Sequence, residues 1–154
     1  MKKIIVLIIT LSLLLNIILI YVFIIKGDTF QSKDNRIALS MSESNKEFVL
    51  DEMRVFLESI QQINEGLSTH NTEKIIKACQ VSGGSVIEHA PKGLLKTFPI
   101  EFKTLGFSTH GIFDEIGINT KNGVDTEIIQ NQVNLLLNNC VACHKSYKIS
   151  TANY

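Results

Sequence analysis

The sequence predicts an all-α protein in which one transmembrane helix precedes an antiparallel four-helix bundle. An apolar run near the N-terminus has the length of a membrane span, and four later segments carry apolar residues at steps of three and four. No segment shows the sustained alternation of apolar and polar residues that is typical of a half-buried strand. Four helices joined mostly by short connections, within about 110 residues, favour an up-down bundle.

Segment 1–26 is expected to be a signal anchor that spans the membrane. Ile4 to Ile25 carries no charged residue, and at about 1.5 Å per residue a helix of this length reaches roughly 33 Å. Lys2 and Lys3 supply a positive flank, which places the N-terminus in the cytoplasm. The run is longer than the apolar region of a cleaved signal peptide, and no Ala-x-Ala-like site follows it, although cleavage is the alternative. Either way, the rest of the chain is expected to be exported.

Segment 27–43 is polar and aperiodic, and we expect a linker that lifts the following domain off the membrane. The first bundle helix is expected from Ser44 to Gly66. Ser44 is the candidate N-cap, Glu47 completes a capping box, and Gly66 ends the helix. The apolar stripe of this helix consists of Val49, Met53, Phe56, Leu57, Ile60, Ile63 and Leu67.

The second and third helices are separated by an irregular stretch. The second is expected to start after Asn71 or Thr72 and to reach about Val81, where a Gly-Gly pair breaks it. Residues 83–98 are expected to be irregular. The third helix opens near Pro99, which suits a first helical turn, and ends at Gly117 and the turn 119–123.

The fourth helix begins at Asp125 or the next residue and continues to about Lys148, so that the bundle occupies residues 44–150. The run Cys-Val-Ala-Cys-His at its end has the spacing of a c-type haem attachment site. In such a site two thiols bind the porphyrin and the imidazole binds iron. Helical geometry places Cys140, Cys143 and His144 on one side of the helix. We therefore predict one covalent haem c.

Other uses of the two cysteines are less well supported. A structural zinc site needs four ligands, and Cys79, His70, His89 and His110 form no second closely spaced pair. A thioredoxin-like dithiol belongs at a strand-to-helix junction, whereas this pair lies late in a helix. Cys79 falls on the apolar side of the second helix and is expected to be a buried small residue.

Over residues 44–150 the chain resembles the cytochrome c-prime family. The haem motif lies in the last helix, a four-helix pattern precedes it, and an aromatic and a basic residue, Tyr147 and Lys148, follow it. The membrane anchor and the irregular stretch 83–98 depart from the family pattern. The resemblance implies an antiparallel four-helix bundle with the haem between helices and His144 as the proximal ligand.

The resemblance also implies two classes, which differ at the sixth coordination position. Low-spin members fill it with a methionine from the first helix, and Met53 lies there, so we expect Met53 to bind the iron. Alternatively, Met53 fills the core, or His110 completes a bis-histidine site. Met41 lies in the expected linker and is a weaker candidate. Arg54 is a candidate partner for a haem propionate.

These observations predict a membrane-anchored electron carrier rather than an enzyme. We expect it in the bacterial inner membrane, with its haem domain on the periplasmic side and membrane or periplasmic redox proteins as partners. From Asp28 onward the chain has 12 Lys and Arg against 15 Asp and Glu, and it has no basic patch with interleaved aromatic residues, so we expect no nucleic-acid partner. The resemblance makes a homodimer an option. The alternative function is a five-coordinate haem module that binds or senses a small gas such as NO or CO.

Overall fold

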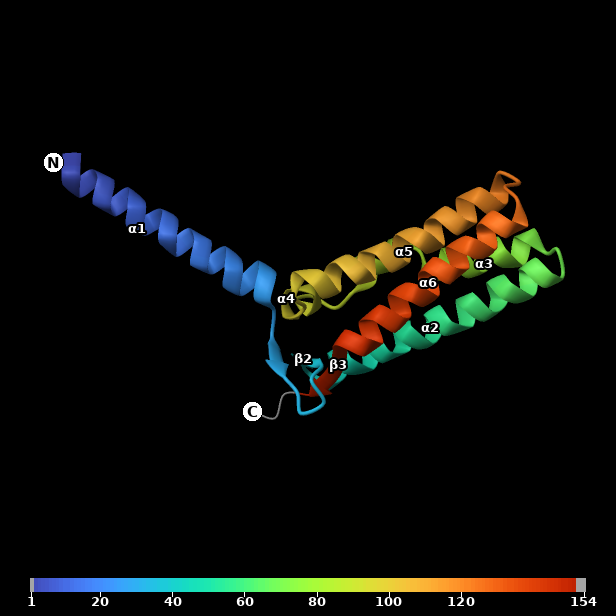
Figure 1. Ribbon diagram of the computed structural model, residues 1–154, viewed down its shortest axis with the longest axis horizontal. Coiled ribbons are helices and arrows are strands. Elements are labelled where there is room, and N and C mark those ends of the chain that lie inside the picture. Colours follow the sequence, from blue (N-terminus) through green and yellow to red (C-terminus); the bar gives the residue numbers. More distant parts are fainter. Residues whose placement is uncertain (1, 152–154) are drawn as a thin grey trace.

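The computed structural model describes residues 2–151, which are mostly helical and include a small three-stranded sheet (Figure 1). The helical character is confirmed. The all-α prediction does not hold, because β1 (Thr29–Gln31), β2 (Ile37–Met41) and β3 (Tyr147–Thr151) form a sheet. β1 pairs with β2 antiparallel, and β2 pairs with β3 parallel.

The strands lack a periodic signal for two physical reasons. β2 buries the neighbouring residues Ala38 and Leu39, so that its sequence does not alternate between apolar and polar positions. β3 begins directly where the last helix ends, and it pairs with residues about 110 positions earlier in the chain. A parallel pairing over such a distance leaves no turn signal in the sequence.

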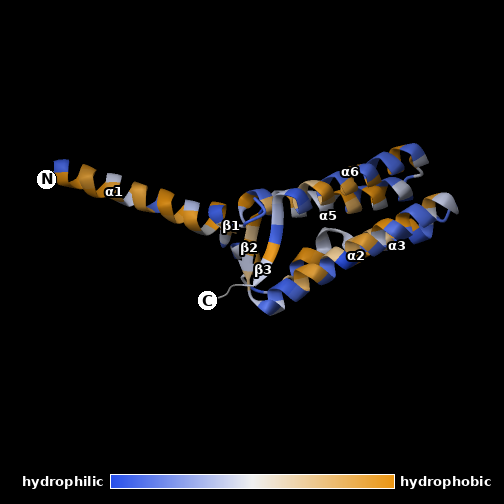
Figure 2. Ribbon diagram, turned by 60° about the horizontal axis from the view of Figure 1, so that its bottom comes forward, coloured by the Kyte–Doolittle hydropathy of each residue, from blue (hydrophilic) through white to orange (hydrophobic). Residues whose placement is uncertain are grey.

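Four long helices account for most of the domain: α2 (Glu43–Ser68), α3 (Thr72–Ser82), α5 (Ile100–Lys121) and α6 (Thr126–Ser146). α2 packs against α3, α3 against α5, α5 against α6, and α6 against α2. Successive helices run in opposite directions, and the sheet lies at the end where α2 begins and α6 finishes (Figure 1). Apolar residues line the facing sides of these helices (Figure 2).

The starts of α3 and α6 agree with the sequence. The Asn71 side chain accepts a hydrogen bond from the backbone N–H of Lys74 at 3.0 Å, and the Asp125 side chain accepts one from Glu127 at 3.1 Å. Each side chain thereby satisfies a backbone donor that the first helical turn leaves unpaired. The prediction for α2 is wrong by two residues, because Ser42, rather than Ser44, is its N-cap.

Two glycines that were expected to end helices lie inside them instead. Gly66 is within α2, and a Cβ atom there would lie 2.5 Å from Cγ1 of Ile75 in α3. Gly117 is within α5, and a Cβ atom there would lie 3.1 Å from Cβ of Cys79. Both glycines therefore permit a close approach of neighbouring helices, which requires the lack of a side chain but no unusual backbone conformation.

The stretch expected to be irregular contains two short helices, the 3₁₀ helix Gly84–His89 and α4 (Leu94–Thr97). α4 lies near the sheet end of the domain, close to the start of α5 (Figure 1). Its Leu94 is buried together with Phe98, so this connection adds apolar residues to the core.

The N-terminal helix α1 (Lys2–Ile20) continues as a π-helix, Tyr21–Lys26. Together they are long and apolar enough to cross a membrane, by length and composition; a signal sequence has the same properties. Apolar residues surround α1 on the sides visible in Figure 2, and its large apolar side chains are exposed. Such a helix is typical of a membrane-spanning segment rather than an amphipathic one.

Segment 27–43, which we expected to be a linker, contains β1 and β2 and is packed onto the domain. The backbone N–H of Asp28 donates to the carbonyl of Thr97 at 2.8 Å, and the ammonium group of Lys103 donates to the carbonyl of Ile24 at 3.1 Å. Gly27 turns the chain between these contacts with a φ of 61°. The end of the N-terminal helix is thus held against the start of α5.

The junction at Gly27 gives a test of this attachment. An alanine Cβ at Gly27 would lie 2.5 Å from the carbonyl carbon of Phe98, whereas one at Gly93 would meet nothing within 4 Å. Both glycines have positive φ, so both alanine variants carry backbone strain; the strain is larger at Gly27, whose ψ of −172° places it in a region that only glycine readily adopts, whereas Gly93 is in the left-handed helical region. We expect Gly27→Ala to lower the midpoint of thermal unfolding of the full chain more than Gly93→Ala does. Equal losses would contradict the packing at Gly27.

Candidate functional site

A cavity of about 300 Å³ lies between α2, α5 and α6. Its volume is at the lower end of the range for small-molecule sites. Two groups of core residues border the cavity. One group lies between the long helices and contributes Phe56 to the lining, and the other lies at the sheet end and contributes Phe102. Most of the lining is apolar. The cavity is therefore an apolar hollow between two packed regions, and it opens to solvent where Leu57, Leu137 and His144 are exposed.

All three residues of the haem motif line this cavity. α6 buries Ile129, Val133 and Leu136 against the other helices, and the same stripe continues toward its C-terminal end. Cys140 and Cys143 are half-buried, and His144 is exposed at the edge of the cavity. The three-residue and four-residue steps that the sequence suggested are thus realised as one side of one helix.

Met53 reaches the same cavity from α2. It is half-buried and packs on the core residues of the sheet end. Met41, the weaker candidate, is buried in β2 and is not among the described residues that line the cavity. Arg54 is exposed and forms an ion pair with Asp51 one helical turn away. The structure therefore brings Met53, but not Met41, to the residues of the haem motif.

His110 enters the cavity from α5 and is buried. Its Nδ1 lies 2.8 Å from the carbonyl oxygen of Ser82; a carbonyl only accepts, so Nδ1 is the donor. The ring of Phe56 packs edge-on against it, with 4.9 Å between centroids. This hydrogen bond to a carbonyl accounts for a buried histidine without any metal. Metal-binding histidines are held in the same way, so His110 stays a second candidate ligand.

Glu52 also lines the cavity, and sequence reasoning missed it. It is half-buried, and burial raises the pKa of its carboxyl group, while the nearby His110 has a smaller, opposing effect. The sequence does contain one signal that could have identified Glu52. Glu52 follows Val49 by three positions and precedes Phe56 by four, so it is a charged residue on an otherwise apolar stripe.

The thiols are protonated at neutral pH. Burial raises the pKa of Cys143 to about 11, with a further contribution from Cys140, and burial also raises the pKa of Cys140. Metal sites that use cysteine need thiolates. Within residues 2–151, no group of three or more His, Cys, Asp or Glu side chains has an arrangement that could hold a metal ion. A haem iron needs only one or two protein ligands, because the porphyrin supplies the others.

The residues around the cavity fit a haem. Gly106 lines it, and a Cβ atom there would meet nothing within 4 Å, so space adjoins the backbone of α5. Three large apolar side chains of the lining, Leu57, Phe107 and Leu137, are exposed. A broad apolar ligand in the cavity would cover such side chains. Two thiols, an imidazole and a thioether form the donor set of a c-type haem.

Comparison of the chain with models of known families finds no match, and comparisons with curated proteins and with solved structures find none either. The assignment of a function therefore depends on the residues of the cavity and on their chemistry.

The buried third cysteine yields a prediction about reactivity. Cys79 is buried, as expected, and burial raises its pKa to about 12, with a smaller contribution from Asp114. At pH 8 only about 1 in 10,000 such thiols is ionised, against about one in four for a thiol of pKa about 8.5. We expect native Cys79 to react with iodoacetamide about a thousandfold more slowly than in urea, as followed by mass spectrometry. Equal rates would show that the second helix does not bury it.

Proposed function

We propose that this chain is a membrane-anchored c-type cytochrome that transfers electrons through one covalently bound haem. The observation that carries the proposal is the convergence of Cys140, Cys143 and His144 from one helix with Met53 from another on a single apolar cavity. The spacing of the two cysteines and the histidine alone supports a haem site. The shared cavity supports it further, because it offers space for a haem and contains a candidate second ligand, Met53, from a different helix.

Each of these side chains has a role in the proposal. Cys140 and Cys143 would attach the haem through thioether bonds, and His144 and Met53 would hold its iron. The bound haem supplies an iron that cycles between the ferric and ferrous states. A neutral thioether favours the ferrous state and raises the potential, and the apolar lining limits access of water.

The fold and the location form the second part of the proposal. We infer that α2, α3, α5 and α6 correspond to the antiparallel four-helix bundle of the cytochrome c-prime family, because they pack in a closed ring and the last of them carries the motif. We place the chain in a bacterial inner membrane with the domain on the periplasmic side. Anchoring raises the effective concentration of the carrier at membrane redox partners.

The domain's charge favours a particular kind of partner. The chain from Asp28 onward carries about three more acidic than basic residues, so a redox protein with a positive docking surface is the complementary choice.

Covalent attachment can be tested by counting free thiols. The full chain, expressed in cells that mature c-type cytochromes, should show Soret absorbance that survives acid acetone. In urea with excess iodoacetamide it should gain one label, on Cys79, because the haem occupies the other two sulfurs. The control Cys79→Ser should keep its pigment and gain no label. A colourless protein that gains three labels would contradict the proposal.

The sixth ligand can be tested by spectroscopy of the same protein. We expect a low-spin ferric spectrum and poor CO binding in the wild type. Met53→Ala should become high-spin and bind CO readily, because removal of the thioether opens the iron. The control Met41→Ala, which removes a methionine that does not line the cavity, should stay low-spin, and so should His110→Ala.

Two other results would assign the site differently. A wild type that is already high-spin and binds CO would favour the gas-binding alternative, since the iron would then have an open position. A change of spin state in His110→Ala, but not in Met53→Ala, would identify His110 as the second ligand.

A further inference from the structure

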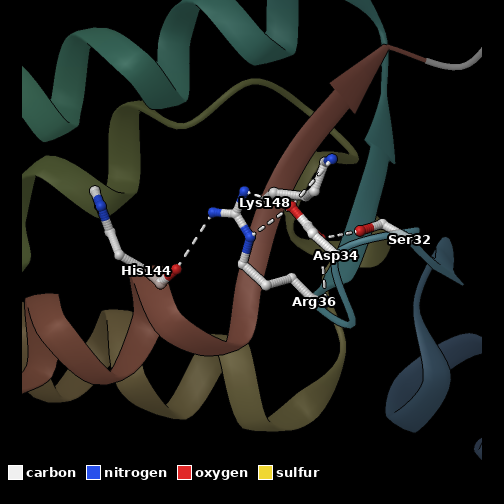
Figure 3. Close-up of polar contacts among 5 residues, drawn as sticks. All are labelled: Ser32, Asp34, Arg36, His144 and Lys148. Carbon is white, nitrogen blue, oxygen red and sulfur yellow. Dashed lines mark hydrogen bonds and ion pairs between the residues drawn. The ribbon is translucent and has the colours of Figure 1, made fainter.

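The last turn of α6, which carries His144, is bound by the loop of the β1–β2 hairpin. Nη1 of Arg36 donates a hydrogen bond to the carbonyl oxygen of His144 at 3.4 Å (Figure 3). The final carbonyl groups of a helix have no partner within the helix, so an external donor can bind them. Arg36 and His144 are 108 positions apart, and no local pattern suggests the contact.

The sheet also fixes the last turn of α6. The backbone N–H of Tyr147 donates to the carbonyl of Cys143, and Tyr147 then lies opposite Ile37 in the parallel pairing of β3 with β2. Ile37 directly follows Arg36 in the sequence. His144 thus lies three residues before the chain enters the sheet, and Arg36, the loop residue directly before β2, binds its backbone carbonyl.

Arg36 is itself held by an acidic side chain. Its Nη2 and Nε lie 2.8 Å and 3.1 Å from Oδ2 of Asp34, and its backbone N–H donates to Oδ1 at 3.2 Å. Ser32 also donates to Asp34, and Nζ of Lys148 lies 3.6 Å from it (Figure 3). The hydrogen bonds from Arg36, and next those from Ser32, hold the pKa of Asp34 well below its usual range. At neutral pH the cluster therefore contains two cations and one anion.

We propose that Arg36 is a positioning residue for the proximal ligand His144, and that the net positive cluster around it raises the reduction potential of the iron. The proposal rests on the proposed function, because it needs a haem on His144. The guanidinium group is charged at every physiological pH. A positive charge close to the iron favours the ferrous state, whose net charge is lower.

Exposure determines how large the effect is and how it can be recognised. The side chains of Arg36 and Asp34 are about 40 % exposed, so water and salt weaken their field. The screening length is about 8 Å at physiological ionic strength. An electrostatic contribution to the potential should therefore shrink in high salt, whereas a contribution from packing alone should not.

The experiment measures the midpoint potential and the ferric electron paramagnetic resonance spectrum of the full, haem-loaded chain. Arg36→Gln should lower the potential and give a more heterogeneous low-spin signal, because both the charge and the hydrogen bond are lost. Arg36→Lys should keep more of the potential, since it retains the charge without the planar fork. Asp34→Asn should raise the potential, because it removes the anion, and it gives an independent test should Arg36→Gln fail to fold.

Lys77→Gln is the matched control. Lys77 forms an exposed ion pair with Glu73 on α3, so its loss removes a surface cation away from the haem motif; the potential and the spectrum should stay unchanged. Raising the salt concentration should reduce both the decrease in potential of Arg36→Gln and the increase in potential of Asp34→Asn. Unchanged potentials in Arg36→Gln and Asp34→Asn, or shifts of the same sign, would overturn the role of Arg36 while leaving the haem in place. A wild type without covalent haem would overturn the proposed function, and the role of Arg36 with it.

Discussion

The parallel pairing of β2 with β3 is the constraint on which the arrangement of the site depends. It joins the segment that follows the N-terminal helix to the segment that follows Cys140, Cys143 and His144, with Ile37 opposite Tyr147. Because β2 leads directly into α2 and β3 directly continues α6, the pairing fixes the ends of these helices side by side. Met53 and His144 lie on these two helices, so a contact between two short strands determines how the opposite walls of the cavity face each other.

The cavity exists because the two core regions do not merge completely. Ile63, Phe113 and Ile116 fill the space between the helices away from the sheet, and Leu39 and Phe98 fill the sheet end. Close-packed interiors hold few voids larger than a water molecule. A gap of about 300 Å³ with exposed apolar side chains around it is therefore costly unless a ligand fills it. This is the physical reason for regarding the cavity as a binding site and not as a packing defect.

Local rules predicted those parts of the fold that depend on local interactions. The starts of α3 and α6 and the common face of Cys140 and His144 follow from local sequence signals, and the structure reproduces them. The sheet, the contact between Arg36 and His144, and the packing of the hairpin at the anchor could not be predicted this way, since each joins segments far apart in the chain. The expectation that Gly66 ends its helix was wrong for a related reason. Its small size permits a close contact with α3, and a local rule for helix ends cannot predict such a contact.

The contacts at the end of the N-terminal helix and the lining of the cavity share residues. Lys103 lines the cavity and also donates to the carbonyl of Ile24 near the end of that helix, while Phe98 lines the cavity beside the backbone that Gly27 contacts. The domain is therefore not suspended on a flexible tether, whose reach would average over many orientations. For the carrier proposed above, such an attachment would restrict which edge of the cavity a membrane partner can approach. It would also favour transfer to partners anchored in the same bilayer, because these would meet the domain in a constant orientation.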